Sequence, residues 1–530
     1  MHLNAAKHIV LNILTECGIK LRKTVFIKNA FILTFSAVVL RFAGIVFKVW
    51  LASAIGSEGI GLYQLIFSFY VLISTFASSG ISTAVTRLIA DELVLGSKNT
   101  CQKILSRAIS ITLILALFSA AITFFGADII AKVFLGDERA AAAIKILPLS
   151  LPFMGVSSCF RGYFIARRRA TPNALSQIFE QGIRIAVVML LVKRFINKGL
   201  SALGFAVMFG DVISEAIGFL WLFVSYKLDA KKLTDLKGRI KTPFSTVKKL
   251  LNISVPITSG RYLNSLLRTA ENVLVPKNLA KYPLNSTSAL SQFGMIKGMA
   301  LPILFFPSAV LNSISTLLIP EMSQAVALGR KEIVKSTAKN ILKLTAFVGF
   351  IFSGIFLAAG DKIGFLIYKE KDVGYLIKAL APIVPLMYLD SISDGILKGL
   401  DQQSYTFKSS VSDSALRIIL ILLTVPFFGL KGFIVIMYFS NCYTCFLHVG
   451  RLLKISGAKF KFLEEIALPI AISVAVSFLS KQLLSYFDIA SNLVYIIFLS
   501  TLSLLMYFII VIKFKLVGID FLKGIFKNST

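Results

Sequence analysis

The chain has 530 residues, of which 56% are hydrophobic and only 16% are charged, and its mean hydropathy is +0.81. Soluble proteins carry about 25% charged residues, so this composition excludes a soluble globular protein. The net charge of +31 would indicate nucleic-acid binding in a soluble protein. In a membrane protein, however, Lys and Arg collect in the cytoplasmic loops, and we therefore expect membrane lipids and no nucleic acid as partners.

Apolar segments of about 20 residues, the length that crosses a bilayer, recur along the whole chain. They predict an all-α polytopic membrane protein with about 14 transmembrane helices. The expected spans are 31–54, 60–82, 108–126, 145–165, 175–192, 201–226, 250–271, 289–319, 342–360, 379–397, 410–428, 432–450, 464–484 and 491–512. Pro302 and Pro307 interrupt the eighth span, where we expect a kink.

The basic residues set the expected orientation. Far more of the 57 Lys and Arg residues fall in alternate connections that include both termini, which predicts that both termini are cytoplasmic. The predicted divisions are an N-terminal arm (1–30), a first six-helix bundle (31–226), a basic linker (227–249), a second bundle (250–453), two further helices (464–512) and a tail (513–530).

An internal repeat relates the two bundles. Residues 61–184 align without gaps on 294–417, and this constant offset matches Arg184-Ile185 with Arg417-Ile418. Because each repeat contains an even number of helices, the repeats are expected to be parallel. Parallel repeats related by an axis along the membrane normal are a known transporter plan. The last two helices have no counterpart.

Four cations lie within membrane-length segments at matching places in the two halves. Arg41 and Lys48 share one face of the first helix, and Arg261 and Arg268 take the corresponding places on the seventh. A charge within the bilayer is costly and normally faces a bundle interior or a wet cavity. We expect these cations to bind an anionic substrate, with Arg suited to phosphate oxygens. Glu271 is a candidate partner for Arg268, which lies one helical turn earlier, and a candidate for coupling or gating.

Two further helices carry opposite charges four residues apart. Glu180 precedes Arg184, and Asp413 precedes Arg417. The acid is nearer the N-terminus in both, which is the favourable order for a helical pair. We interpret both as structural ion pairs, with a gate that breaks and re-forms as the functional alternative.

Five other intramembrane charges are candidates for substrate binding, coupling or gating. Arg161 and Asp394 occupy equivalent repeat positions with opposite charge, which allows a salt bridge between the halves. Asp211 and Glu215 share a face of the sixth helix and are candidates for a coupling ion, unless they pair with other buried cations. Lys297 is a candidate for the cavity lining.

No pattern for catalysis or cofactor binding is present in the sequence. There is no Gly-rich phosphate loop and no metal-ligand spacing, and His2, His8 and His448 form no cluster along the chain. We expect no enzyme activity and no cofactor, and the coupling ion is not readable from the sequence.

The predicted helix plan and three stretches resemble a known family. The stretches are LRFAG at Leu40–Gly44, GSEGIGLYQLIFSFY at Gly56–Tyr70 and SVPITSGRYLNSL at Ser254–Leu266. They are similar to the stage V sporulation protein B family of the multidrug/oligosaccharidyl-lipid/polysaccharide exporter superfamily, which also contains lipid II flippases. The resemblance runs over nearly the whole chain.

The resemblance implies a flippase of the bacterial cell membrane that moves an undecaprenyl-pyrophosphate-linked sugar precursor, such as the peptidoglycan precursor of a spore cortex, by alternating access. It implies that Arg41, by its R-x-x-G context, meets the pyrophosphate, and that Arg261 and Arg268 do so as cations of the second half. Cell-wall synthesis proteins are further candidate partners. Fold resemblance alone does not fix the substrate.

Three other functions remain open. A polysaccharide-unit exporter would need the same basic residues to bind its anionic substrate. A multidrug or cation antiporter shares the fold, but cationic drugs need carboxylates and the first helix offers two cations and no acid. A membrane scaffold for cell-wall synthesis would not need repeated buried cations.

Overall fold

The computed structural model describes residues 2–78, 80–94, 98–231, 243–283, 286–459, 465–466, 468–487 and 491–514. Throughout these ranges the regular structure is helical, with no strand. Ten helical segments of the described chain are long and apolar enough to cross a membrane. The prediction of an all-α polytopic membrane protein is therefore confirmed, whereas the count of 14 helices stays a prediction.

The N-half contains the elements from α1 to α8. Gly56 adopts φ 72° and ψ 177°, so α1 consists of two arms that match the first two predicted spans. The elements are α1 (His2–Ser78), α2 (Ile81–Val94), α3 (Lys98–Phe125), α4 (Ala127–Ile129), η1 (Ile130–Leu135), η2 (Glu138–Ala140), α5 (Ala141–Ile146), η3 (Leu147–Leu149), α6 (Ser150–Ala166), α7 (Thr171–Phe195), η4 (Ile196–Lys198) and α8 (Leu200–Ala230).

The C-half contains the elements from α9 to α16, and α17 and α18 follow it. A break at Gly429 (φ 56°, ψ −136°) divides α16 into two arms, in the same way as α1. The elements are α9 (Pro243–Leu279), α10 (Ser286–Gly294), η5 (Met295–Ala300), α11 (Leu301–Phe305), α12 (Ser308–Ala327), α13 (Lys331–Tyr368), α14 (Lys371–Leu380), η6 (Ala381–Ile383), α15 (Val384–Gly399), α16 (Gln403–Ser456), α17 (Leu468–Ser485) and α18 (Asn492–Lys513).

Two of the predicted features can be compared directly with the described helices. The interruption expected at Pro302 and Pro307 is present, because α11 ends at Phe305 and α12 begins at Ser308. Helix α1 already begins at His2, so the predicted arm continues into the first span as one helix. The tail beyond residue 514 and most of the linker (232–242) lie outside the described residues.

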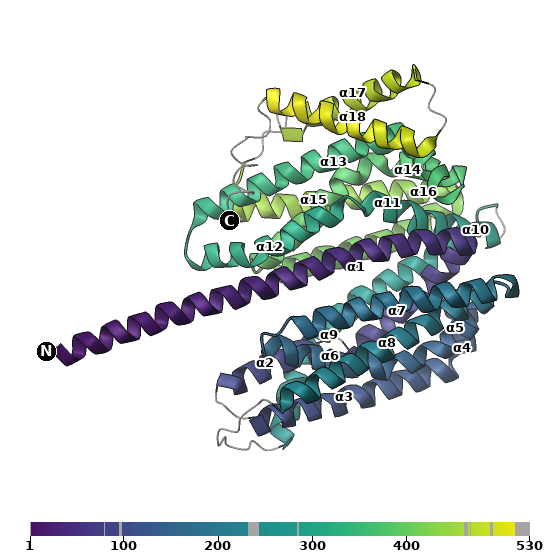
Figure 1. The fold of residues 1–530 in the computed structure, drawn as a ribbon. Coiled ribbons are helices and arrows are strands. Elements are labelled where there is room, and N and C mark those ends of the chain that lie inside the picture. Colours follow the sequence, from purple (N-terminus) through teal and green to yellow (C-terminus); the bar gives the residue numbers. More distant parts are fainter. Residues whose placement is uncertain are drawn as a thin grey trace.

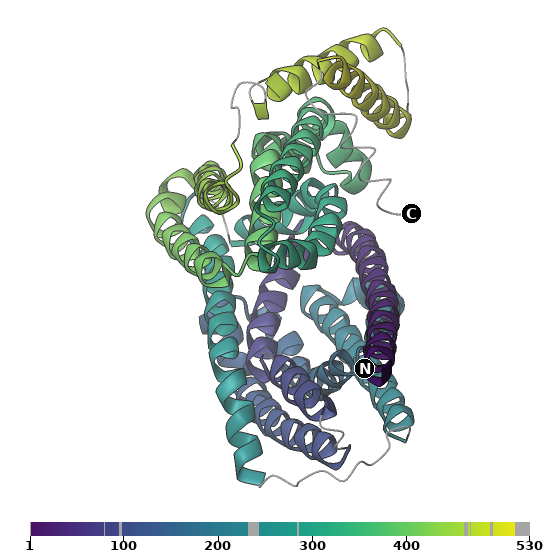
Figure 2. The same ribbon diagram turned by 90° about the vertical axis from the view of Figure 1, so that its left-hand side faces the viewer.

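The two halves lie side by side, and α1 runs along the N-half where it faces the C-half (Figure 1). Viewed along α1 from its N-terminal end, α1 lies at one side of the molecule and α9 at the other (Figure 2). Helices α17 and α18 pack on the outer side of α13, away from the N-half. The two helices that carry the predicted substrate cations therefore both run along the boundary between the halves.

The halves meet most closely where two glycines cross. Gly61 of α1 and Gly294 of α10 occupy equivalent positions of the internal repeat. A Cβ atom added to Gly294 would lie 2.0 Å from the carbonyl oxygen of Ser57, and one added to Gly61 would lie 2.3 Å from that of Leu290. Only glycine permits this approach, and Ser57 and Ser291 share a 2.6 Å hydrogen bond beside it. Contact between equivalent residues is expected for two repeats that face each other across a twofold axis.

Candidate functional site

Helix α1 contacts both halves beside Arg41. The ring of Phe42 lies 6.3 Å from that of Phe306, which follows α11 in the C-half. A Cβ atom added to Gly44 would lie 3.9 Å from the side-chain nitrogen of Gln181 on α7 of the N-half. The segment that carries Arg41 is therefore part of the boundary.

Helix α9 has the same relation to the two halves beside Arg261. The ring of Tyr262 packs edge-on against Phe76 of the N-half, with 5.7 Å between centroids. A Cβ atom added to Gly260 would lie 3.6 Å from the ring of Phe407 on α16 of the C-half. Arg41 and Arg261 thus occupy corresponding places on two boundary helices.

The four predicted substrate cations, which we call the interface cations, are Arg41, Lys48, Arg261 and Arg268. The three arginines are exposed and Lys48 is half-buried. None forms a salt bridge with a carboxylate among the side chains that the structure describes. Cations left without acidic partners at the boundary are able to accept an anionic ligand.

The N-half cluster consists of five charged residues from three adjacent helices. Arg161 of α6 donates a 2.5 Å hydrogen bond to Glu180 of α7. Arg184 of α7 contacts Asp211 of α8, and its second nitrogen lies 3.8 Å from Glu215. The cluster therefore holds three carboxylates and two guanidinium groups.

The acids of the N-half cluster are buried and incompletely paired. Asp211 is 2% exposed and Glu215 5%, and Asp211 Oδ2 and Glu215 Oε2 have no hydrogen-bond partner among the described atoms. Glu180 lies against α8 at Gly218, where an added Cβ would be 2.1 Å from its Oε1. Because Gly218 lies about one turn after Glu215, the absence of a side chain there brings Glu180 close to the same face of α8.

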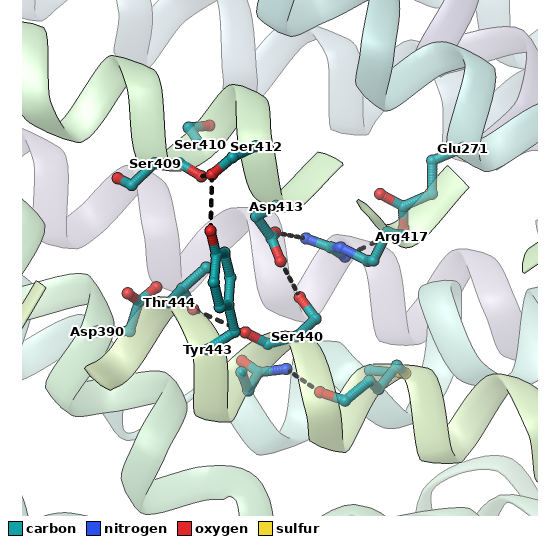
Figure 3. Close-up of polar contacts among 12 residues, drawn as sticks. Glu271, Asp390, Ser409, Ser410, Ser412, Asp413, Arg417, Ser440, Tyr443 and Thr444 are labelled. Carbon is teal, nitrogen blue, oxygen red and sulfur yellow. Dashed lines mark hydrogen bonds and ion pairs between the residues drawn. The ribbon is translucent and has the colours of Figure 1, made fainter. Parts of the chain in front are cut away.

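The C-half cluster consists of four charged residues and is balanced. Glu271 of α9 accepts from Lys297 of η5 at 3.0 Å and from Arg417 of α16 at 3.2 Å. Arg417 also donates to Asp413 at 2.8 Å, and Ser440 donates to the other Asp413 oxygen at 2.6 Å (Figure 3). Two cations here match two carboxylates, and every carboxylate is hydrogen-bonded.

Polar side chains continue from this cluster along the facing sides of the two arms of α16. We call this set, Ser409 and Asp413 on one arm and Ser440 and His448 on the other, the polar ladder. Ser409 lies one turn before Asp413, and His448 lies two turns after Ser440, so both arms present polar groups to each other. Ser409 Oγ is 2.5 Å from His448 Nε2, and His448 Nδ1 is 2.7 Å from Asp390 of α15. Sequence reasoning missed this contact, although the four-residue spacing of polar residues on both arms was a usable signal.

Two predicted pairings are wrong in this structure. Glu180 pairs with Arg161 instead of Arg184, because α6 places a guanidinium closer than the next turn of α7 does. Glu271 pairs with Lys297 and Arg417 and not with Arg268, since it faces the interior of the C-half while Arg268 is exposed.

The salt bridge that the repeat positions of Arg161 and Asp394 allowed does not form among the described residues, because Asp394 pairs with Lys398 on its own helix and Arg161 with Glu180. His448 contacts Ser409 and Asp390, a pairing that the sequence analysis did not predict. By contrast, the predicted pair of Asp413 with Arg417 is present. Asp211 and Glu215 share one face of α8 as predicted, and both lie beside the half-buried Arg184.

Comparisons with known proteins agree with this architecture. The model of the polysaccharide biosynthesis protein family matches residues 26–326. The chain is 27% identical to "Stage V sporulation protein B" of Bacillus subtilis (strain 168), over 95% of this chain and 98% of that protein. It is 21% identical to "Lipid II flippase MurJ" of the same organism, over 74% and 76% of the two chains.

Solved structures with the same fold are transporters. An inward closed conformation of lipid II flippase MurJ superposes with a TM-score of 0.68 at 14% identity, covering 91% of this chain and 97% of that one. An inward-facing multidrug resistance MATE family transporter of the MOP superfamily superposes with a TM-score of 0.59 at 14% identity, over 79% and 94%. The chain therefore has the MurJ/MATE-like transporter fold.

Proposed function

Because this chain belongs to the polysaccharide biosynthesis protein family, we propose that it is a flippase for an undecaprenyl-pyrophosphate-linked sugar precursor. The observation that carries the proposal is the set of interface cations. Arg41 and Arg261 occupy corresponding places on the two boundary helices, and neither has an acidic partner among the described side chains.

The chemistry of the substrate explains why such cations are needed. A pyrophosphate carries charges that cannot enter hydrocarbon unaided, whereas a polyprenyl tail is soluble in it. Guanidinium groups bind phosphate oxygens through two parallel hydrogen bonds. Cations on two helices at opposite sides of the boundary would hold the headgroup between the halves while the tail stays in the lipid.

The driving force need not come from ATP. An anion moving outward is favoured by an inside-negative membrane potential, by about 2.3 kcal/mol per charge per 100 mV. Rocking of the two halves about the Gly61–Gly294 contact would expose the headgroup to each side in turn. Relatives of this chain whose names refer to sporulation and to lipid II support a cell-wall precursor as the cargo.

The test is complementation of cells that lack their own lipid II flippases, with wild type, Arg41→Ala and Arg261→Ala at matched expression. We expect rescue by wild type and failure of both variants. Lys132→Ala is the matched control, because it also removes one positive charge, but from an exposed pair with Glu138. Equal rescue by all four chains would contradict the cationic headgroup site.

A second set of assays distinguishes between the candidate substrates. If wild type does not rescue these cells, the same four chains are assayed in cells that lack a polysaccharide-unit exporter and for resistance to cationic drugs. Rescue of polysaccharide export that depends on Arg41 would reassign the sugar and keep the mechanism. Drug resistance that does not depend on Arg41 would contradict the proposal.

A further inference from the structure

The N-half cluster holds one more negative charge than it can neutralise internally. Arg161 offsets Glu180 and Arg184 offsets Asp211, which leaves Glu215 with only a 3.8 Å contact to a guanidinium that Asp211 already engages. Glu215 is 5% exposed. An uncompensated carboxylate in such a position is costly, and it normally becomes neutral by taking up a proton.

The surroundings of Glu215 bring no further cation from the elements packed on it. Among the described residues, the groups that face it are Arg161 on α6, Glu180 and Arg184 on α7, Asp211 on α8, and the phenol of Tyr70 on α1. Glu180 and Asp211 oppose a second negative charge, and the Tyr70 phenol, which is buried, brings no positive charge. The free oxygen Oε2, without a hydrogen-bond partner among the described atoms, is the place where a proton would sit.

We propose that the Glu215 carboxyl group is a buried proton-binding site, and that it gains and loses this proton as the two halves move. A proton requires a single oxygen atom. A metal cation would need several oxygen ligands, whereas Asp211 Oδ1 and Glu215 Oε1 already face Arg184. That this proton is the coupling ion of transport rests on the proposed function. That Glu215 binds a proton does not rest on it.

The Gln181 side chain connects the site to the boundary. Arg184 donates a 3.3 Å hydrogen bond to Gln181 Oε1, and Gln181 Nε2 lies near Gly44, about one turn after Arg41. A change in the charge around Arg184 would therefore alter its hydrogen bond to Gln181, and through Gln181 the surroundings of Arg41 on α1. This contact provides a direct route between protonation and the substrate site.

The experiment is infrared difference spectroscopy on the purified full chain in lipid, recorded during a pH titration without substrate. Wild type is expected to show the carbonyl band of a protonated carboxylic acid, shifted in D2O and lost at high pH. The band should be absent from Glu215→Gln and retained in Asp413→Asn, a matched acid of the balanced C-half cluster. Sodium at constant pH should leave the band unchanged.

Three results would overturn the proposal: no such band in wild type at any pH, a band that persists in Glu215→Gln, or a band removed by sodium. Fluorescence gives a second readout if the Gln variant folds poorly. Trp221 of α8 packs on Phe179 of α7 in a tilted arrangement, with 4.9 Å between the ring centroids. In a Trp50→Phe chain, Trp221 is the remaining tryptophan, so the emission reports on α7 and α8. Its emission should titrate together with the infrared band. Because no substrate is present, failure of the lipid-linked cargo assignment would leave these results unaffected.

Discussion

The two charge clusters are built around repeat-related arginines, Arg184 and Arg417, but only the second is electrically balanced. Around Arg417, two cations meet two carboxylates, and Ser440 satisfies the remaining oxygen of Asp413. Around Arg184, three carboxylates meet two guanidinium groups and two carboxylate oxygens stay unbonded among the described atoms. The comparison indicates that the C-half cluster holds helices together, while the N-half cluster keeps one acid available for a proton.

The largest difference is expected on removing the two arginines. Arg184→Ala leaves Asp211 and Glu215 buried without their cation, and breaking a buried pair in this way costs about 3–5 kcal/mol. Arg417→Ala should cost less, because Glu271 keeps Lys297 and Asp413 keeps Ser440. The measurement is the thermal unfolding midpoint of the purified chains. Lys132→Ala is the control, with an expected change within about 0.5 kcal/mol. A larger loss at Arg417 would contradict the comparison.

Neutralising one acid in each cluster gives the next largest contrast. Glu271→Gln removes the carboxylate that Lys297 and Arg417 share, and we expect a loss of about 3 kcal/mol. Glu215→Gln should leave the unfolding midpoint at neutral pH almost unchanged, because Gln resembles a protonated Glu in shape and charge. Equal losses in the two variants would show that Glu215 is charged and paired in the folded chain.

Substitution at the Gly61–Gly294 contact, which joins the halves, is expected to cost less free energy than Arg184→Ala or Glu271→Gln. Gly294→Ala places a methyl group against the Ser57 carbonyl, and overpacking of this kind costs about 1–3 kcal/mol. The closed contact should therefore open more often. In a chain whose native cysteines are replaced, labelling of Ser57→Cys by a water-soluble thiol reagent should rise at least about fivefold, since about 1.4 kcal/mol is tenfold.

Gly182→Ala is the matched control for this prediction, because nothing lies within 4 Å of a Cβ atom added there. Its labelling rate should equal that of the parent chain. An unchanged rate in Gly294→Ala would mean that the glycine crossing does not hold the halves together.

Sequence reasoning reached the helical architecture because hydropathy and helix length are local properties. It also placed Arg41 and Arg261 at corresponding positions, since the repeat is visible as an offset in the residue numbers. It failed on Glu180, because four-residue spacing identifies only partners on the same helix. Whether Arg184 or Arg161 engages Glu180 depends on how α6, α7 and α8 pack, and Gly218 decides part of that packing. His448 was missed although Ser440, Thr444 and His448 recur every four residues, because that spacing marks a polar helix face without naming the helix that packs on it.

The smallest predicted effect compares two serines at equivalent positions of the internal repeat, Ser176 and Ser409. Ser176 donates only to the carbonyl of Asn173 on its own turn, whereas Ser409 donates likewise to Thr406 and also contacts His448. Both are buried, so Ser176→Ala and Ser409→Ala remove the same atoms from similar places. Ser409→Ala should cost about 1 kcal/mol more. A double-mutant cycle of Ser409→Ala with His448→Ala should recover that difference as a coupling energy. If the cycle gives no coupling energy, the Ser409 hydroxyl is bonded only to the Thr406 carbonyl of its own helical turn. The contact with His448 then contributes nothing to stability.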